Sequence, residues 1–311
     1  MSEKIIISLF VLFFSCSRLE NAKGEYNEIS IFMSDEDKEY ILPYIDTFVN
    51  KTIDMPISEK IYKINIYNSD KFFKYKHNRN IILLSLKNPQ DFTADLLFEK
   101  FKDKNNNNIF SINDMFSYNQ LILCINAFDS IEFEKVFKNN ILWIDSMIND
   151  NINKTLLYYN KRYDLNHEIV DYIKQNYNLQ MNIDENYKII KTSNDFIWIG
   201  RGYPYRWITI NKNIDKNFAN DYFLYTKDIL EKSIKSIIIN DNYNKTQNFN
   251  NYTYIQGLYE HEESDTGGPY FSYIIESNNK LTLISGFVNN PGKTKHKLYK
   301  QLDALITEYI D

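Results

Sequence analysis

The chain has 311 residues, 43% of them hydrophobic, and its 36 lysine and arginine residues are outnumbered by 41 aspartate and glutamate residues, which gives a formal net charge of −5. Charges of both signs are interspersed, so there is no basic face suited to a phosphate backbone, and this excludes nucleic acid as a partner. A chain of this length can form a sizeable core without disulfides, as one large domain or two ordinary ones.

The first residues have the pattern of a bacterial lipoprotein signal peptide. A lysine precedes an apolar run over residues 5–14, and Ser15 and Cys16 follow. The run is short for a membrane span, which needs about 20 apolar residues, and it fits a signal core of about 7 to 15 residues. We expect residues 1–15 to be removed and Cys16 to be lipidated, with a tether over residues 16–27. The alternative is a buried N-terminal strand or an uncleaved anchor.

Lipidation of Cys16 predicts a location in the bacterial cell envelope, where acyl chains hold the protein to a membrane on its periplasmic or surface face. Each buried methylene contributes about 0.8 kcal/mol, so two or three chains anchor durably. The other cysteine, Cys124, lies in the apolar run 121–125, which predicts a buried strand. A buried thiol behaves as a small hydrophobe, whereas a catalytic thiol needs an electropositive, exposed setting. No cysteine spacing indicates a metal, and we expect no metal and no cofactor.

The first half of the chain alternates strand and helix patterns. Ser34 can cap a helix that starts with acidic residues and carries an apolar stripe at helical spacing. A second long helix begins at a capping box formed by Asp129 and Glu132. The expected strands cover residues 29–33, 61–67, 81–86 and 120–128, and a further helix covers residues 166–177.

The second half has strand patterns separated by one helix that ends near Ile237, and it closes with a helix capped by Thr294. The expected strands cover residues 187–191, 195–199, 205–210, 252–259, 269–276 and 281–288. Hairpins mixed with helices predict an α+β fold, in which amphipathic helices pack on antiparallel sheets. We place the halves at residues 28–178 and 179–311. Two similar halves remain an alternative, although no residue-level repeat supports duplication.

Three segments resemble a known family. Residues 268–273 read Gly-Pro-Tyr-Phe-Ser-Tyr, residues 285–288 read Ser-Gly-Phe-Val, and a helix with Gln-Leu at residues 301–302 follows. Residues 194–199 are similar to the central motif of the same family, an acidic residue and an aromatic residue before a strand with tryptophan. The family consists of Bacteroidetes lipoproteins catalogued as domain of unknown function 4837. The order of elements is similar along nearly all of the mature chain.

The chain departs from the family pattern in two places. Leu258-Tyr259 stands where the family has Leu-Trp, and residues 200–205 form an aromatic turn in place of a charged segment. The resemblance implies an envelope location and a fold. It supplies no catalytic residues, because no activity is established for the family.

An acidic loop is the strongest chemical candidate in the sequence. It contains Glu260, His261, Glu263 and Asp265, and glycines follow at residues 267–268. Carboxylates and an imidazole can bind a divalent cation or act as acid and base. The spacing matches no standard ligand motif, however, and the alternative is a solvated hairpin loop.

An aromatic turn is the second candidate, with the residues Arg201, Tyr203, Tyr205, Arg206 and Trp207. Aromatic stacking and guanidinium hydrogen bonds are typical of glycan or peptide recognition. The alternative is a hairpin connection whose aromatic side chains pack across it.

A basic segment contains His77 with Lys74, Lys76 and Arg79. It could face anionic headgroups, and the alternative is a solvated basic loop.

The acids Asp221, Asp228 and Glu231 share one predicted helix without a nucleophile beside them. No Gly-rich phosphate loop, serine elbow or zinc motif is present. We therefore expect a non-enzymatic binding or structural module that is anchored in the envelope and contacts a partner protein or a cell-wall component. The alternative is an envelope hydrolase or metal-dependent enzyme that uses residues 260–265 with Arg201 or Arg206.

Overall fold

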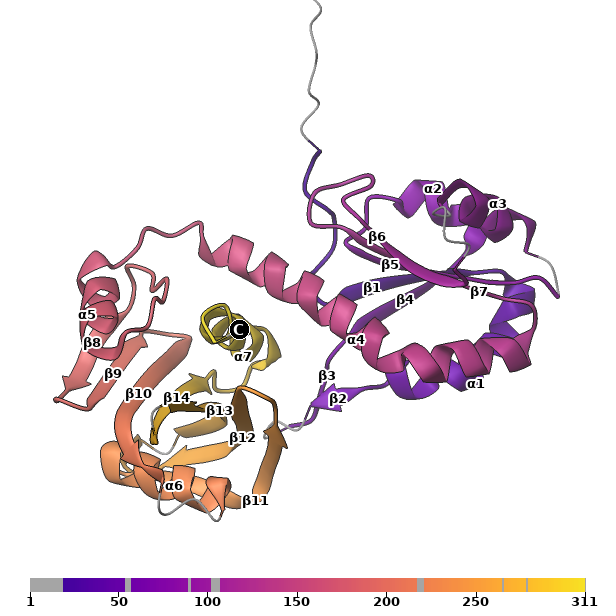
Figure 1. Cartoon of the computed structure of the whole chain (residues 1–311). Coiled ribbons are helices and arrows are strands. Elements are labelled where there is room, and N and C mark those ends of the chain that lie inside the picture. The colour runs from indigo at the N-terminus through magenta and orange to yellow at the C-terminus, as the bar shows by residue number, and fades with distance from the viewer. Residues whose placement is uncertain are drawn as a thin grey trace, which may run out of the picture.

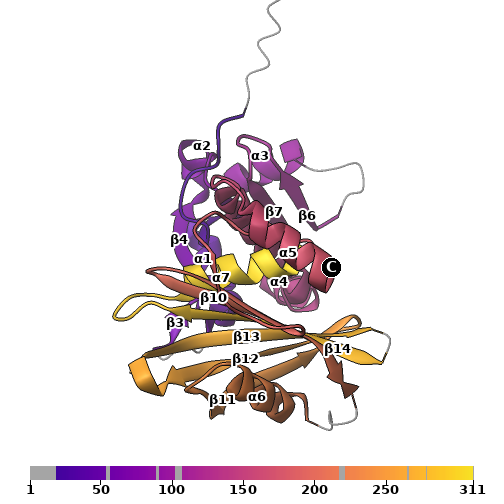
Figure 2. The same ribbon diagram turned by 90° about the vertical axis from the view of Figure 1, so that its left-hand side faces the viewer.

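A computed structural model describes residues 19–53, 57–88, 91–101, 107–216, 221–264, 266–277 and 279–310. Residues 1–18, with Cys16 and the expected signal peptide, lie outside the described residues. The described chain forms two main β-sheets that lie at opposite ends of the molecule in both views (Figures 1 and 2). The long helix α4 (Ser130–Asn160) runs from the first sheet towards the second.

The first sheet has five strands in the order β4-β1-β5-β7-β6. β1, β4, β5 and β7 are parallel to one another, and only β6 is antiparallel to its neighbour. The strands are β1 (Glu28–Met33), β4 (Lys63–Asn68), β5 (Asn80–Leu86), β6 (Ile109–Asn113) and β7 (Leu121–Ala127). Every residue of β5 is buried, as is typical of a parallel strand with both faces covered.

Helices cover both faces of the first sheet (Figure 1). On one face, α1 (Asp35–Val49) and α4 pack in a core with Ile31, Leu84 and Leu123. On the other face, α2 (Phe72–Tyr75) and α3 (Phe92–Phe101) pack in a core with Phe32 and Leu83. The short 3-10 helix η1 (Ser69–Lys71) precedes α2. The expected cap at the start of α1 is present, because the Ser34 hydroxyl oxygen accepts from the amide of Asp37 at 2.9 Å.

The second sheet has seven antiparallel strands in the order β11-β12-β13-β14-β10-β9-β8. The strands are β8 (Lys188–Thr192), β9 (Phe196–Arg201), β10 (Tyr205–Asp215), β11 (Ile237–Asn248), β12 (Tyr252–His261), β13 (Thr266–Ser277) and β14 (Lys280–Asn289). α5 (His167–Tyr177) and α7 (His296–Thr307) pack on one face, and α6 (Tyr222–Ser233) packs on the other. The short 3-10 helix η3 (Glu262–Ser264) joins β12 to β13.

The α+β class predicted from the sequence is confirmed, with two differences. The first sheet is mostly parallel, because its continuous apolar runs form strands that are buried on both faces rather than hairpins with one wet face. The two sheets also differ in strand number and pairing, so the alternative of two similar halves does not hold. α5, which precedes the expected boundary after residue 178, packs through Ile169 and Ile173 in the core of the second sheet.

α7 joins the two halves. Its residue Ala304 lies in the core of the first sheet, while Leu302 and Ile306 lie in the core of the second. α7 also packs along α4. A small two-stranded sheet of β2 (Thr52–Ile53) and β3 (Glu59–Lys60) lies between the two halves, close to the start of α7. None of the helices in the described ranges is both long and apolar enough to cross a membrane.

Candidate functional site

The aromatic turn predicted as a binding surface is the hairpin between β9 and β10. Arg201 and Arg206 are cross-strand partners in it. Successive strand residues point to opposite faces, so Arg206 lies on the α7 face and Trp207 lies on the α6 face. The Trp207 ring packs there, 5.9 Å from Trp198 and 5.7 Å from Tyr259. The structure thus separates Trp207 from the two arginines.

Arg201 is held by side chains from the segments before and after α5. Its Nη1 lies 2.9 Å from the Oδ2 atom of Asp184, in an ion pair with both partners mostly buried. Its guanidinium also lies 5.7 Å from the ring of Tyr163 and 5.8 Å from that of Tyr187. These contacts fix the hairpin against the segments on either side of α5.

Arg206 is buried, and its Nη1 donates to Oε1 of Gln301 in α7 at 3.0 Å. Burial lowers the pKa of the Arg206 guanidinium from its ordinary value. Burial likewise raises the pKa of the nearby Tyr187 hydroxyl to about 12. Arg206 therefore ties β10 to α7, which leaves the two tyrosines of the turn as its exposed part.

Tyr203 and Tyr205 are 56% and 43% exposed, and their ring centroids lie 6.0 Å apart. The peptide bond between Tyr203 and Pro204 is cis. Nζ of Lys293 lies 5.4 Å from the Tyr203 ring, so this aromatic pair already has a cation from the segment before α7.

The acidic loop does not assemble into a site within the described residues. Glu260 and His261 are successive residues of β12, so their side chains point to opposite faces. Glu263 lies 2.7 Å from Nζ of Lys235, and hydrogen bonding to that lysine lowers the pKa of the Glu263 carboxyl. Asp265 lies outside the described residues. Among the residues that are described, no group of three acidic, histidine or cysteine side chains is arranged to hold a metal ion.

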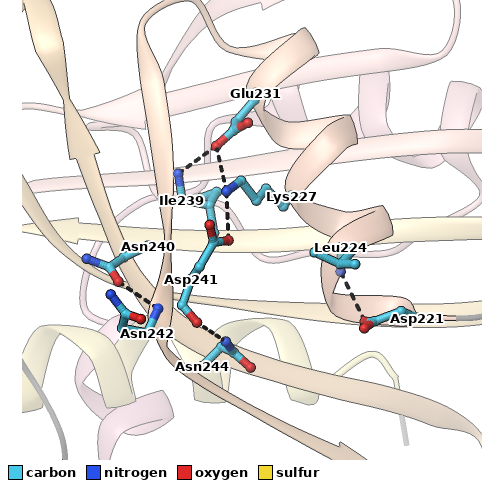
Figure 3. Close-up of polar contacts among 9 residues, drawn as sticks. All are labelled: Asp221, Leu224, Lys227, Glu231, Ile239, Asn240, Asp241, Asn242 and Asn244. Atoms are coloured by element: carbon cyan, nitrogen blue, oxygen red, sulfur yellow. Dashed lines mark hydrogen bonds and ion pairs between the residues drawn. The ribbon is translucent and has the colours of Figure 1, made fainter.

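The acids of α6 have structural roles. Asp221 caps the helix by accepting from amides of its first turn. Oε1 of Glu231 accepts from the amide of Ile239 at 2.9 Å (Figure 3). Asp228 lies 2.6 Å from Lys232. Their spacing along one helix therefore does not indicate a catalytic face.

Beside Glu231, the edge strand β11 bulges outward over residues 240–243, where its pairing with β12 shifts. Lys227 reaches Asp241 in the bulge at 2.7 Å, and the side-chain amide of Asn244 donates to the Asp241 carbonyl at 2.7 Å (Figure 3). Regular pairing resumes at Asn244 and continues through Lys245 and Gln247. Both of these residues line the cavity that we regard as the main candidate site.

This cavity, here called the central cavity, lies between the two halves and has a volume of about 610 Å³. It is lined by α4, by β11, β12 and β13 of the second sheet, and by α7. Its size falls within the range of about 300 to 1,000 Å³ that is typical of small-molecule sites. Its lining residues include Lys51, Tyr62, Asp145, Asn149, Lys245, Gln247, Phe249, Tyr252, Tyr254, Gln256, Tyr273, His296, Tyr299, Lys300 and Asp303.

On the side of the first half, the carboxylate of Asp145 contacts two donors. The Tyr62 hydroxyl donates to Oδ1 of Asp145 at 2.6 Å, and Nζ of Lys51 lies 2.8 Å from Oδ2. Burial, followed by the charge of Asp145, raises the pKa of the Tyr62 hydroxyl. Tyr62 therefore remains protonated and acts as a hydrogen-bond donor.

On the side of the second half, the Tyr273 hydroxyl donates to Oδ1 of Asp303 at 2.6 Å, with both residues buried. Nζ of Lys300 lies 3.5 Å from the other oxygen of Asp303. The hydroxyl groups of Tyr254 and Tyr299 lie 2.7 Å apart. Burial raises the pKa of Tyr254, Tyr273 and Tyr299, so this wall presents neutral hydroxyl groups.

His296 lies at the start of α7 and lines the central cavity as well as a second cavity of about 690 Å³ beside it. Its Nδ1 lies 2.8 Å from the Tyr26 hydroxyl, and its buried Nε2 has no hydrogen-bond partner in the described part of the chain. Burial, with a smaller effect of Lys300, lowers the pKa of His296 to about 4. The imidazole is therefore neutral at pH 7.

The cap of α7 differs from the sequence expectation. Thr294 does not cap the helix, and the N-cap residue Lys295 makes no side-chain cap bond. Instead, Glu59 of β3 accepts from the amides of Lys295 at 2.9 Å and His296 at 3.0 Å. A carboxylate at a helix N-terminus is stabilising, and here it also joins the two halves.

Sequence reasoning missed the central cavity. Its polar side chains come from segments that are far apart along the chain, as Tyr62, Asp145, Tyr254 and Asp303 show. The many tyrosines of the sequence were a signal of this cavity, but tyrosine and phenylalanine are abundant in the whole chain, so the signal was not specific.

Cys124, the candidate for a catalytic thiol, is buried, and burial raises the pKa of its thiol, as expected for a structural cysteine.

Residues 166–308 match the model of a family described as a domain of unknown function, DUF4837. The resemblance to that domain is thus confirmed for the segment from α5 to α7. No curated protein matches the chain.

Solved structures with some likeness to the chain have low identity. The Saccharomyces cerevisiae Ran-binding protein Mog1p is 9% identical with a TM-score of 0.30, over 42% of this chain and 87% of that chain. A mutant of the protein Mog1 has the same identity and TM-score, over 42% and 90%. A protein from Bacteroides thetaiotaomicron is 11% identical with a TM-score of 0.26, over 40% and 42%. Similarity at this level gives no information about the activity or the ligand of this chain.

Proposed function

We propose that the protein is a lipid-anchored protein of the bacterial cell envelope that binds a neutral cell-wall glycan in the central cavity, without catalysing a reaction on it. The observation that carries the proposal is the composition of the cavity wall, which combines aromatic rings, side-chain amides and balanced charges. Sites of this kind bind polar ligands through a few convergent hydrogen-bonding groups and apolar contact.

The charges on the cavity wall favour an uncharged ligand. Three lysines and three aspartates line it, so their formal charges sum to zero. They are Lys51, Lys245, Lys300, Asp145, Asp150 and Asp303. An anionic or cationic ligand would meet as many like charges as opposite ones, whereas a neutral ligand is under no such constraint.

The remaining groups suit a ligand with many hydroxyl groups. Gln247 and Gln256 each offer an amide donor and an acceptor. Tyr252 and Tyr254, both partly exposed, provide ring surface beside them. A glycan presents hydroxyl groups at its edges and apolar C–H surface on its faces, and the wall offers partners to both.

Calorimetric titration of the full-length protein in detergent with uncharged glycan fragments of the cell wall tests this proposal. The double variant Gln247→Ala/Gln256→Ala should lose at least about tenfold in affinity, because two hydrogen-bonding side chains are removed. Gln175→Ala, at an exposed position on α5 outside the cavity, should bind like the wild type. Equal binding by both variants, or none by the wild type, would overturn the glycan assignment.

The anchor is tested separately. Metabolic labelling with a fatty-acid analogue should mark the wild type and fail to mark Cys16→Ala, since the thiol of Cys16 would accept the lipid. Labelling of both, or of neither, would contradict the anchor and leave the glycan assay unaffected.

A further inference from the structure

The described chain is fixed to the first sheet from its first residues. The amide of Tyr118 donates to the carbonyl of Glu20 at 2.8 Å, and the amide of Ala22 donates back to the carbonyl of Tyr118 at 2.9 Å. The amide of Lys23 donates to the carbonyl of His77 at 2.8 Å. Residues 20–23, which lie in the tether predicted over residues 16–27, are therefore part of the fold.

The side chain of Arg79 also holds residues 20–23 in place. The side chain is buried, and its Nη2 donates to the carbonyl of Ala22 at 2.7 Å while its Nη1 lies 3.3 Å from the Thr155 hydroxyl of α4. Arg79 is thus not part of the basic surface that the sequence suggested. His77 is also engaged, since its Nδ1 lies 2.9 Å from the Ser117 hydroxyl.

The number of residues between Cys16 and Glu20 sets how far the protein can move from a lipid on Cys16. Cys16 precedes Glu20 by four residues, and four extended residues span at most about 14 Å. A lipid on Cys16 would therefore hold Glu20 within about that distance of the bilayer surface. In both views the described chain begins at the top of the molecule, at the end where α2 and α3 lie, with the second sheet at the other end (Figures 1 and 2).

The outer side of α2 and α3, here called the helical face, exposes apolar side chains beside Lys74 and Lys100 and beside the exposed acid Glu99. Phe73, Phe92 and Leu96 are 54%, 69% and 74% exposed. Lys74 lies beside Phe73 in α2, and Nζ of Lys100 lies 6.0 Å from the Phe73 ring. Phe92, Leu96 and Lys100 follow one another at intervals of four along α3, which places them on one side of the helix.

We propose that the helical face rests on the lipid bilayer that carries the anchor, with Phe73, Phe92 and Leu96 in the headgroup region and the side chains of Lys74 and Lys100 next to lipid phosphates. This inference rests on the proposed anchor at Cys16, which sets the reach. Apolar and aromatic side chains flanked by lysines are typical of surfaces that lie in the membrane interface.

Fluorescence quenching tests the orientation. The lipidated protein carries an environment-sensitive label at Lys71→Cys, just before α2, or at Lys232→Cys on α6, both exposed lysine positions. In vesicles of phosphatidylglycerol with quencher-labelled lipid, we expect at least about fivefold stronger quenching at position 71 than at 232. The native Cys124 is fully buried and should not react. Equal quenching at the two positions would overturn the inference.

Two further variants separate the helical face from the anchor. Leu96→Asn should reduce quenching at position 71 several-fold, because a large apolar side chain leaves the interface. Leu142→Asn, which changes an 84% exposed leucine on α4, should not alter it. An equal loss with both variants would contradict the role of the helical face. A failed anchor would instead appear as protein that does not float with the vesicles at all.

Discussion

The Tyr26 hydroxyl lies 2.8 Å from Nδ1 of His296, so a side chain from the first half meets the first residue of α7. His296 is 4% exposed, and burial lowers its pKa from 6.5 to about 4. In the unfolded chain the imidazole is free to bind a proton at its ordinary pKa. This junction therefore makes the stability of the protein depend on pH.

The pKa of His296 is lower in the folded protein than in the unfolded chain, so acid favours unfolding. Its contribution is complete above pH 6.5 and is lost as the pH falls towards 4, by up to about 3 kcal/mol. We expect His296→Gln to flatten the decline in unfolding free energy over this range in urea titrations. His167→Gln, at the exposed first residue of α5, should leave the decline unchanged. The same slope in all three proteins would contradict the neutral state of His296.

Asp37 should have the opposite pH dependence. It is fully buried, its Oδ2 accepts from the amide of Leu86 at 3.0 Å, and burial raises its pKa to about 7. The folded protein therefore binds this proton more tightly than the unfolded chain, and stability is lost as the pH rises from about 4 to about 7.

Asp37→Asn removes the charge and keeps an acceptor for Leu86. We expect it to raise the unfolding free energy at pH 8 by on the order of 2 kcal/mol, and by less at pH 5. Asp46→Asn, at an exposed position of the same helix, is the control and should change little at either pH. A gain that is the same at both pH values would show that the charge of Asp37 is not the cause.

Glu59→Gln tests the cap of α7 that comes from the first half. The glutamine keeps one acceptor oxygen but loses the charge at the helix N-terminus, so we expect a loss of about 1 kcal/mol in unfolding free energy at low salt. The loss should shrink in high salt. Glu39→Gln, exposed on α1, should have no comparable effect. A loss independent of salt would mean that the charge of Glu59 is not responsible.

Tyr273→Phe tests the hydrogen bond at the wall of the central cavity. Without the hydroxyl, Oδ1 of the buried Asp303 loses its donor at 2.6 Å, and we expect a cost of about 2 kcal/mol in unfolding free energy. In the Asp303→Asn background, Tyr273→Phe should cost less unfolding free energy, and a double-mutant cycle should give a coupling of about 1 kcal/mol between the two residues. Tyr243→Phe, at a 55% exposed position, is the control. Additive costs would rule out the bond as the source.

The local features of the fold could be predicted from the sequence because their partners are near in the chain. The Ser34 cap is one example. The start of α4 is another, since the amide of Glu132 donates to Oδ1 of Asp129 at 2.9 Å as predicted. The return bond differs by one residue, because Oε2 of Glu132 accepts from the amide of Phe128 at 2.6 Å rather than from that of Asp129. The apolar runs also predict the strands β5 and β7, although they do not predict that these strands pair in parallel.

The candidate site could not be predicted in the same way. Glu59 caps a helix that starts more than two hundred residues later, and Tyr62 and Asp303 line one cavity from opposite halves. Such contacts depend on how the halves pack, which no spacing in the sequence encodes. The composition of residues 260–265 predicts a site, yet composition does not determine where the side chains point. Glu260 and His261 are successive residues of β12, so their side chains point to opposite faces of the sheet.

The place of α7 in both cores makes the packing of each half depend on the other. A fragment limited to residues 166–308 would retain all seven strands of the second sheet, but it would lack Glu59 and Tyr26 and would leave Ala304 in contact with water. The segment that matches the family therefore lacks contacts that α7 makes in the full chain, and the first half serves the second as an intramolecular partner.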